Sequence, residues 1–329
     1  MEKLLNMLTE YKKTCALLAG IKLGILSKLS QQKISLNELS QSISVDPEML
    51  LLLLTYFLSE GVVEYTEGLW RTTEAYTVDE KVKEDFLNIT EHEENIYRHW
   101  NTPENITDAV RKGVGQRVFD LQGFRSDSLV KYNRAMYGNN VRVLSFWIKR
   151  YIRHIKSISF LEFGRSPGVL AGSLKGQDAE IKADTAVFDS LYDITCQKLE
   201  GSDICVHKLS GIKDFKKYNV VAMFNTVHYY SKKDLEKVLR RFHTELEDGA
   251  VLCIADVFHS GDSRFKSGVL VDWITHGGTS FIFIEELTNL LNETGFSITK
   301  IKNLPEISAD LIICSVKKEN EVEKCSVNL

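Results

Sequence analysis

The stretch "FLEFGRSPGVLAGSL", residues 160–174, decides the fold of this chain. It begins with apolar residues typical of a buried strand, passes through a turn that holds Gly164 and Gly168, and continues as a helix. A small residue is needed where backbone approaches a ligand closely, and the N–H groups that begin a helix can bind one. The stretch predicts a ligand-binding turn, although two glycines around a serine are a weak signal by themselves.

Strand-like and helix-like segments alternate beyond residue 156, which predicts a doubly wound, mostly parallel sheet. The expected strands are 157–163, 182–188, 203–207, 218–224, 249–257, 296–304 and 309–316. The last two follow each other without a helix between them, so we expect an antiparallel hairpin at one edge of the sheet.

Ligands of such sheets bind at the carboxyl ends of the strands, beside the switch in strand order. Gly164, Asp189, Asn225 and Asp256 each follow or end a predicted strand, so they are expected around one crevice. Asp189 comes at the end of the strand after Gly164, where a carboxylate can accept hydrogen bonds from two ribose hydroxyls. The alternative is an aspartate that caps a helix and binds no ligand.

The first half of the chain is largely helical. Helix starts are expected at Ser35 and at Asp46, which precedes a proline, and Gly61 ends the second helix. The segment 62–73 then alternates around Glu67-Gly68 as a hairpin does. Two helices followed by a hairpin predict a winged helix.

Charge argues against DNA binding by this winged helix. The second helix, "DPEMLLLLLTYFLSE" (46–60), holds three acidic residues and no lysine or arginine, whereas DNA binding needs cations against phosphate. Its consecutive leucines predict burial against protein, so a homodimer through this domain is expected.

Composition supports a soluble globular protein. The 329 residues are 43% hydrophobic and 26% charged, and the net charge of −4 favours neither nucleic acid nor an anionic membrane as a partner. Charged residues interrupt the apolar N-terminal segment, so we expect neither a signal peptide nor a membrane span. We therefore expect a cytoplasmic location. The six cysteines form no C-x-x-C pair, so no metal site is expected.

The motifs follow one another as in a known family. The chain resembles, over about residues 3–316, the class I O-methyltransferases that use S-adenosylmethionine and carry an N-terminal winged-helix dimerisation domain. That family's acidic-x-G-x-G-x-G motif is similar to "EFGRSPG" (162–168), with Ser166 in place of the middle glycine. Arg165 and Pro167 then fall at variable positions, whose side chains can point away from the cofactor.

The resemblance implies an α/β chain whose catalytic domain has a Rossmann-like, seven-stranded sheet. It also implies S-adenosylmethionine as the cofactor, with "VFDSLYDIT" (187–195) supplying its ribose ligand. The cofactor-binding residues expected on this basis are Glu162, Gly164, Ser166, Gly168, Asp189 and Asn225.

The same resemblance suggests catalytic residues. The segment "NTVHYYS" (225–231) is similar to the one that holds the family's general base, so His228 takes that role, while Tyr229 replaces the aspartate that follows the base. Restoring an aspartate at position 229 is expected to hold or raise activity. Asp256 is expected to orient His228 or to touch the substrate.

The acceptor pocket is expected in two other segments. The segment "YNRAMYGNN" (132–140) resembles the family's acceptor-binding helix, which suggests Met136, Asn139 and Asn140 as substrate ligands. His276, before two glycines, is a further candidate.

The expected domains are a winged-helix dimerisation domain (1–85), a helical linker with acceptor-pocket helices (86–155), a Rossmann-like catalytic domain (156–318) and a disordered tail (319–329). The expected function is O-methylation of a small aromatic or secondary-metabolite acceptor. Two alternatives stay open. Ser166 and Tyr229 motivate non-methylating chemistry on the same fold, such as cyclisation or decarboxylation, and the other alternative is a non-catalytic dimeric binding protein.

Overall fold

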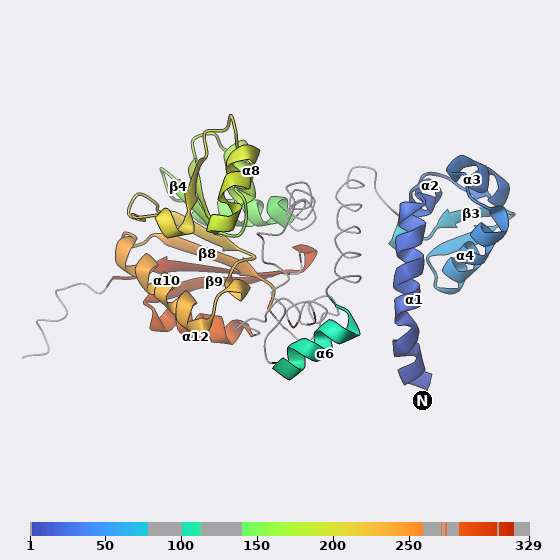
Figure 1. Cartoon of the computed structure of the whole chain (residues 1–329). Coiled ribbons are helices and arrows are strands. Elements are labelled where there is room, and N and C mark those ends of the chain that lie inside the picture. Colours follow the sequence, from blue (N-terminus) through green and yellow to red (C-terminus); the bar gives the residue numbers. More distant parts are fainter. Residues whose placement is uncertain are drawn as a thin grey trace, which may run out of the picture. The chain divides into compact units, whose positions relative to one another are not determined.

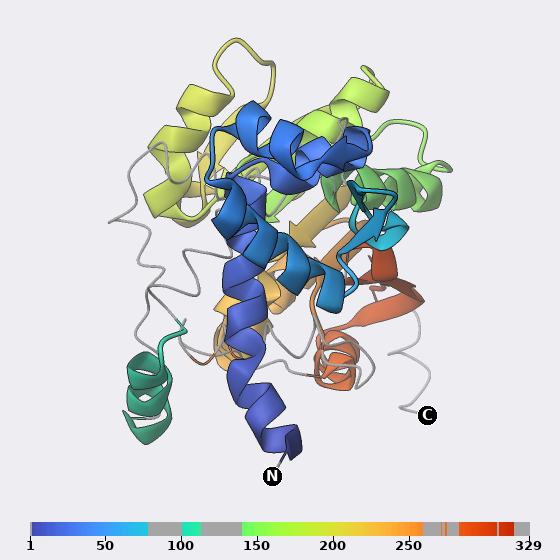
Figure 2. The same ribbon diagram turned by 90° about the vertical axis from the view of Figure 1, so that its right-hand side faces the viewer.

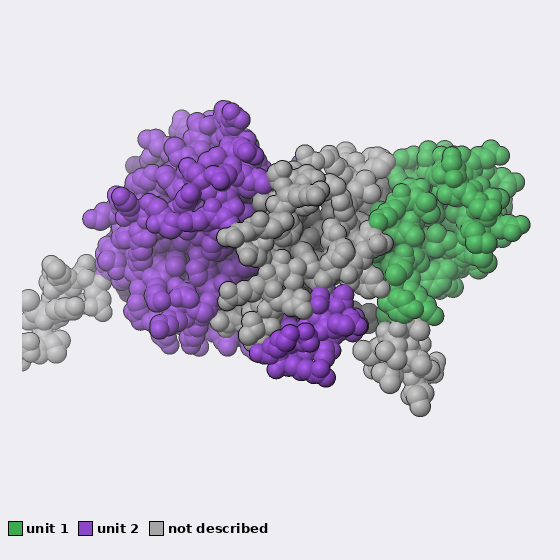
Figure 3. All heavy atoms as spheres, in the orientation of Figure 1, with its two compact units in different colours: residues 1–95 green, residues 96–329 purple. Residues whose placement is uncertain are grey.

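The computed structural model describes residues 2–77, 101–112, 140–258, 271, 274, 283–307 and 309–318. The chain divides into two compact units, residues 1–95 and 96–329, which Figure 3 shows in different colours.

The N-terminal unit combines helices with a small antiparallel sheet in the order β1-β3-β2 (Figures 1 and 2). Its elements are α1 (Glu2–Lys22), α2 (Ile25–Gln31), β1 (Ile34–Ser35), α3 (Leu36–Ile43), α4 (Pro47–Ser59), β2 (Val63–Thr66), β3 (Leu69–Thr72) and the 3-10 turn η1 (Glu74–Tyr76). The predicted order of two helices and a hairpin is present, and β1 adds a third short strand.

Local sequence signals explain these boundaries. Ser35 and Glu38 form a capping box at the start of α3, and the Asp46 carboxylate accepts the Met49 N–H (2.9 Å) at the start of α4. Glu67 and Gly68 both have positive φ, as the tight turn between β2 and β3 requires. The predicted helix starts and hairpin are thus confirmed.

The C-terminal unit is built on a seven-stranded sheet in the order β6-β5-β4-β7-β8-β10-β9. Its strands are β4 (Ser159–Gly164), β5 (Lys182–Val187), β6 (Cys205–Lys208), β7 (Val220–Phe224), β8 (Val251–Asp256), β9 (Phe296–Leu304) and β10 (Ala309–Val316). Strands β4 to β8 pair in parallel, whereas β10 is antiparallel to both β8 and β9. All seven predicted strands are present, and the predicted edge hairpin is confirmed.

Helices cover both faces of this sheet. One apolar cluster packs α10 (Lys232–Glu245) and α12 (Ile284–Glu293) against the sheet, and another packs α8 (Val169–Gln177) and the helix at 140–152 against its other face (Figure 1). Further elements of this unit are α6 (Pro103–Lys112), α9 (Tyr192–Lys198) and the 3-10 turns η5 (Asp189–Leu191), η6 (Leu209–Gly211), η7 (Val227–Tyr229) and η8 (Pro305–Ile307).

The strand order determines where a ligand can bind. The chain runs outward from β4 to β5 and β6, then returns to place β7 on the other side of β4. The order therefore reverses between β4 and β7, and the crevice of a doubly wound sheet lies at the carboxyl ends of the strands beside such a point.

Within the described ranges, no single helix combines the length and the apolar composition that a membrane span requires. Helices α3 and α4 meet these criteria only when they are taken together, and the chain bends by 114° between them.

Candidate functional site at the carboxyl ends of the strands

The turns that follow β4 and β7 are in direct contact. Gly164 has a φ of +127°, and a Cβ added there would collide with the side chain of Thr226. The Arg165 N–H donates to Thr226 Oγ1 (3.1 Å), and that hydroxyl donates to the carbonyl of Phe224 (2.8 Å). Gly164 is therefore required by the approach of the β7 turn, a contact that the glycine motif alone does not reveal.

Glu162 supports the first turn from inside the protein. It is completely buried, and its Oε2 accepts the N–H of Ala171 (2.8 Å) in the first turn of α8. Burial raises the pKa of Glu162 to about 7, although hydrogen bonds around the carboxylate oppose the rise. The structure thus places this predicted cofactor residue under the turn, where it caps α8.

Three buried polar atoms gather around this turn. Glu162 and Thr185 are register partners on β4 and β5, and Ser166 follows β4 in the turn itself. Thr185 Oγ1 has no hydrogen-bond partner among the described residues, which is unusual for a buried polar atom. The Ser166 hydroxyl interacts with the Glu162 carboxylate and opposes the rise of its pKa.

Arg165 lies inside the site. Its side chain is 3% exposed, and its guanidinium carbon is 4.7 Å from the centroid of the Tyr229 ring. The guanidinium packs against Tyr229 because the ring supplies a favourable face for the cation. Tyr229, which stands where the resemblance predicts an aspartate, therefore contacts Arg165.

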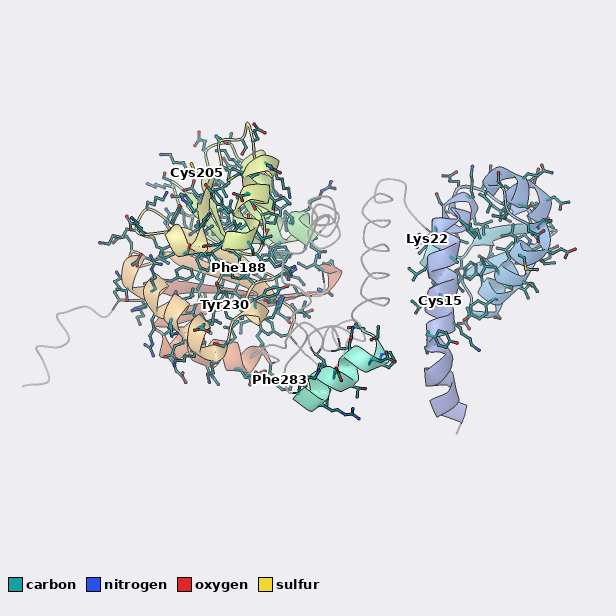
Figure 4. The ribbon with its side chains drawn as sticks, in the orientation of Figure 1. Cys15, Lys22, Phe188, Cys205, Tyr230 and Phe283 are labelled. Carbon is teal, nitrogen blue, oxygen red and sulfur yellow. The ribbon has the colours of Figure 1, made fainter. Side chains whose placement is uncertain are left out.

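Aromatic side chains continue from Tyr229. Its ring centroid lies 4.2 Å from that of His228 and 6.3 Å from that of Phe188. Phe188 and Tyr230, which Figure 4 labels, have centroids 6.0 Å apart. The ends of β5 and β7 thus share an aromatic cluster next to Asp189 and His228, which the sequence analysis did not predict.

Asp256 orients His228. The ring Nδ1 lies 2.8 Å from Asp256 Oδ1, and Oδ2 accepts the N–H groups of Thr226 (3.1 Å) and Val227 (2.9 Å). Because a carboxylate only accepts, we assign the proton to Nδ1, which places the lone pair of a neutral ring on Nε2. Asp256 is buried and the His228 side chain is 15% exposed. The acid missing at position 229 is supplied from the neighbouring strand.

Asp189 is exposed at the end of β5 and is held by the turn after β6. Its Oδ2 accepts the Ser210 hydroxyl (2.5 Å) and its Oδ1 accepts the Ser210 N–H (3.2 Å). The Ser210 side chain and backbone hydrogen bonds lower the pKa of Asp189. The carboxylate binds Ser210 and makes no side-chain cap at η5, and its role as a ribose ligand stays a prediction. Ser210 carries no sequence signal, since only the pairing of β5 with β6 brings it there.

The other predicted residues are placed as follows. Gly168 precedes α8 with a φ of +73°, and an added Cβ would collide with Leu199. Asn225 has a φ of +46° and donates its N–H to the Ala255 carbonyl (2.9 Å), which turns the chain out of β7. Asn140 begins the described part of the helix at 140–152 and is half-buried. Met136, Asn139 and His276 lie outside the described residues.

Comparisons with known proteins agree on the fold. No protein-family model and no curated protein sequence matches the chain. Many solved structures match, and three of them show the likeness along nearly the whole of both chains. The pyocyanin biosynthetic protein PhzM has a TM-score of 0.76 at 15% identity and covers 96% of this chain and 98% of its own. The mitomycin 7-O-methyltransferase MmcR has a TM-score of 0.74 at 15% identity and covers 96% of this chain and 97% of its own. Human N-acetylserotonin methyltransferase in complex with SAM has a TM-score of 0.72 at 14% identity and covers 96% of this chain and 98% of its own.

At these identities the likeness concerns the fold. The chain has the fold of these proteins, and the predicted fold class, with a Rossmann-like seven-stranded sheet, is confirmed.

Proposed function

We propose that the chain is an S-adenosylmethionine-dependent methyltransferase that methylates a hydroxyl group on a small aromatic or secondary-metabolite acceptor. The observation that carries the proposal is the hydrogen-bonded pair of His228 and Asp256 at the ends of β7 and β8. Strand β7 lies beside the point where the strand order reverses, and β8 is its neighbour. Structures with this fold include an O-methyltransferase and a methyltransferase bound to SAM, which supports the same assignment.

The residues at this edge fit the cofactor. The exposed carboxylate of Asp189, with its lowered pKa, suits two ribose hydroxyls, and the Ser166 hydroxyl, which interacts with the Glu162 carboxylate, can still accept a hydrogen bond. Glu162 holds the turn between them by capping α8. When bound, the cofactor supplies an electrophilic methyl group on a sulfonium.

Methyl transfer requires mainly that the protein hold the acceptor hydroxyl in line with the methyl group. Holding a nucleophile in line with an activated group contributes up to about 7 to 11 kcal/mol. A phenol titrates near 10 and an imidazole near 6.5, so complete deprotonation before attack would cost about 5 kcal/mol. His228 therefore acts as a general base that accepts the proton at Nε2 while the oxygen attacks.

Asp256 assists in two ways. Its Oδ1 keeps the proton of His228 on Nδ1, and its negative charge stabilises the imidazolium that forms as the acceptor loses its proton. Its Oδ2 holds the backbone that carries His228. The aromatic rings of Phe188, Tyr229 and Tyr230 suit an aromatic acceptor. Met136, Asn139, Asn140 and His276 stay predicted acceptor ligands.

The N-terminal unit is proposed to form a winged-helix homodimer interface. Met49 and Leu52 on α4 are 61% and 65% exposed, and Leu51, Leu58 and Tyr65 are also exposed. Contiguous exposed apolar side chains are typical of protein interfaces. The expected domain limits, 1–85, 86–155, 156–318 and 319–329, are retained as part of this proposal.

One observation favours a second candidate. Arg165 brings a cation to the turn that would face a cationic sulfonium, so the fold can instead serve non-methylating chemistry on another ligand. Incubation with methyl-labelled S-adenosylmethionine and a phenol library, read by mass spectrometry, separates the two. A labelled product supports methyl transfer, bound cofactor without any labelled product supports the second candidate, and absence of cofactor binding contradicts the proposed function.

A further inference from the structure

We infer that one surface of the C-terminal unit binds an anionic phospholipid membrane. This basic surface consists of five cations around one aromatic ring: Arg142, Arg150, Arg153, Lys300 and Lys302 around Phe146. The inference goes beyond the proposed function, since none of these residues belongs to the site at the carboxyl ends of the strands.

The helix at 140–152 supplies most of the basic surface. Its apolar side packs against the sheet. Arg142, Phe146 and Arg150 follow one another at intervals of four residues, so they lie on the opposite, exposed side. Arg153 comes three residues later and is also exposed. The segment 142–156 contains five lysines and arginines and no aspartate or glutamate, so this side of the helix is strongly positive.

Strand β9 adds two lysines beside the helix. Lys300 and Lys302 are register partners of Ile313 and Leu311 on β10, and these two apolar residues belong to the cluster that packs the helix against the sheet. Register partners on antiparallel strands point to the same face of a sheet, so both lysines lie on the face that carries the helix. Lys302 Nζ lies 3.9 Å from the centroid of the Trp147 ring, which joins strand and helix into one surface.

The cations of the basic surface are not neutralised within the described ranges. The ion pair that this helix makes there joins Lys149 to Asp178 (3.6 Å), which follows α8, and does not involve any of the five cations. The net charge of the whole chain is −4, so the rest of the chain is more acidic than this total. The total charge, which argues against an anionic membrane as a partner, therefore does not describe this surface.

Phe146 indicates which anionic partner fits. Its side chain is 55% exposed, and Arg142 and Arg150 lie one helical turn before and after it. Its ring meets Trp147 edge to face, with centroids 5.4 Å apart, so the ring is supported at the surface. An exposed apolar ring among cations matches a partner in which an anionic layer covers an apolar phase. A phospholipid membrane has this structure, since phosphate groups lie directly over acyl chains.

Single-stranded nucleic acid fits the basic surface less well. Such a ligand stacks its bases on open aromatic faces. Lys302 Nζ (3.9 Å) and the Arg150 guanidinium carbon (5.8 Å) already lie over the Trp147 ring, and Tyr151 stacks against it with centroids 6.3 Å apart. Trp147 therefore positions the cations and offers no open face to a base.

The first test uses the wild-type full chain and two kinds of vesicle. Sedimentation would measure its partition onto large vesicles of phosphatidylcholine alone and of phosphatidylcholine with about one-third phosphatidylserine, at about 0.05 M and about 0.5 M NaCl. We expect binding to the anionic vesicles at low salt, at least about tenfold weaker binding at high salt, and at least about tenfold weaker binding to phosphatidylcholine alone, because the attraction is largely electrostatic.

The second test locates the contact. The variants are Arg150→Gln with Arg153→Gln, Lys300→Gln with Lys302→Gln, and Phe146→Ser, and the matched control is Lys232→Gln with Lys233→Gln on the exposed first turn of α10. One cation near an anionic leaflet strengthens binding by about fivefold, so each double variant of the basic surface should lose about tenfold to 25-fold in partition. Phe146→Ser should lose about tenfold, because its ring no longer inserts. The control should stay within about twofold of wild type.

Several outcomes would overturn the inference. Absence of binding to the anionic vesicles, or equal binding to both kinds, would contradict it directly. A loss in the α10 control as large as in the double variants would mean that total charge decides binding. Stronger binding of a fluorescent oligothymidylate than of vesicles, lost in the same variants, would assign the surface to nucleic acid. The two double variants change separate elements, so unfolding of one, seen in its melting temperature, leaves the other as a test.

Discussion

Asp256 at the end of β8 accepts the Nδ1 proton of His228 across 2.8 Å, although the two residues follow different strands. The same carboxylate accepts the N–H groups of Thr226 and Val227, so one buried acid holds both the ring and the backbone that carries it. The base and the acid that orients it therefore act as one unit.

Removing the base should abolish most of the turnover. We expect His228→Ala to lower kcat by about 10² to 10⁴ and to leave S-adenosylhomocysteine affinity nearly unchanged, because the imidazole acts on the acceptor. Asp256→Asn should also lower kcat. The variant that combines His228→Ala with Asp256→Asn should have a kcat only slightly below that of His228→Ala alone. Asp184→Asn, on a partly buried aspartate in β5 that accepts hydrogen bonds from Lys217 and Tyr218, is the control. Additive losses in kcat would show that the two residues act separately.

Placing an aspartate at position 229 should not help. The resemblance predicts that Tyr229→Asp holds or raises activity, but Asp256 already orients His228 and Tyr229 lies against Arg165. The new carboxylate would pair with Arg165 and remove the ring against which its guanidinium packs, which would disturb the turn after β4. We therefore expect lower S-adenosylhomocysteine affinity in Tyr229→Asp and a smaller change in Tyr229→Phe, measured by calorimetry. Higher kcat in Tyr229→Asp would support the resemblance instead.

Asp189 should contribute to cofactor affinity as a charged acceptor. Asp189→Ala is expected to weaken S-adenosylhomocysteine by about 1.5 to 3 kcal/mol, since the ribose loses charge-assisted hydrogen bonds. Ser210 lowers the pKa of Asp189, so affinity should persist as pH falls until the carboxylate becomes protonated. Ser210→Ala should move that loss of affinity to higher pH. Unchanged calorimetric affinity in Asp189→Ala would remove the residue from the site.

Glu162 should make stability depend on pH. Its pKa is raised to about 7 in the folded state, so the folded protein binds more protons than the unfolded chain between about pH 4.5 and pH 7. The free energy of unfolding should therefore decrease as pH rises through this window. The contribution is on the order of 3 kcal/mol.

Denaturant unfolding at pH 5 and pH 8 checks this. Glu162→Gln can still accept the Ala171 N–H and should lack this part of the pH dependence, so its stability relative to wild type should rise with pH. Glu180→Gln, at an exposed loop position, serves as the control. Parallel pH profiles for wild type and Glu162→Gln would mean that Glu162 titrates at its ordinary pKa.

The exposed apolar side of α4 should mediate self-association. We expect a homodimer by light scattering at micromolar concentration, and a monomer when Met49 and Leu52 are both replaced by Glu, because an interface cannot bury unpaired carboxylates. Val110→Glu, on the equally exposed apolar Val110 of α6, should leave the mass unchanged. A monomer mass for wild type would contradict the proposed interface.

Sequence by itself determined the local elements and their order. Caps at Ser35 and Asp46 and the turn at Glu67-Gly68 follow from side chains and φ preferences that act within a few residues. Apolar runs of strand length predicted all seven strands, and the missing helix after residue 304 predicted the edge hairpin. The same local patterns pointed to Asp189, His228 and Asp256 at the ends of strands.

Tertiary structure alone decided which of these ends meet and how. Ser210 binds Asp189 because β6 pairs with β5, and Asp256 binds His228 because β8 pairs with β7. The burial of Arg165 against Tyr229 depends in the same way on β7 lying beside β4. Periodicity reports which face of an element is buried, whereas contacts between strand ends depend on strand order, which many weak and distant interactions determine together.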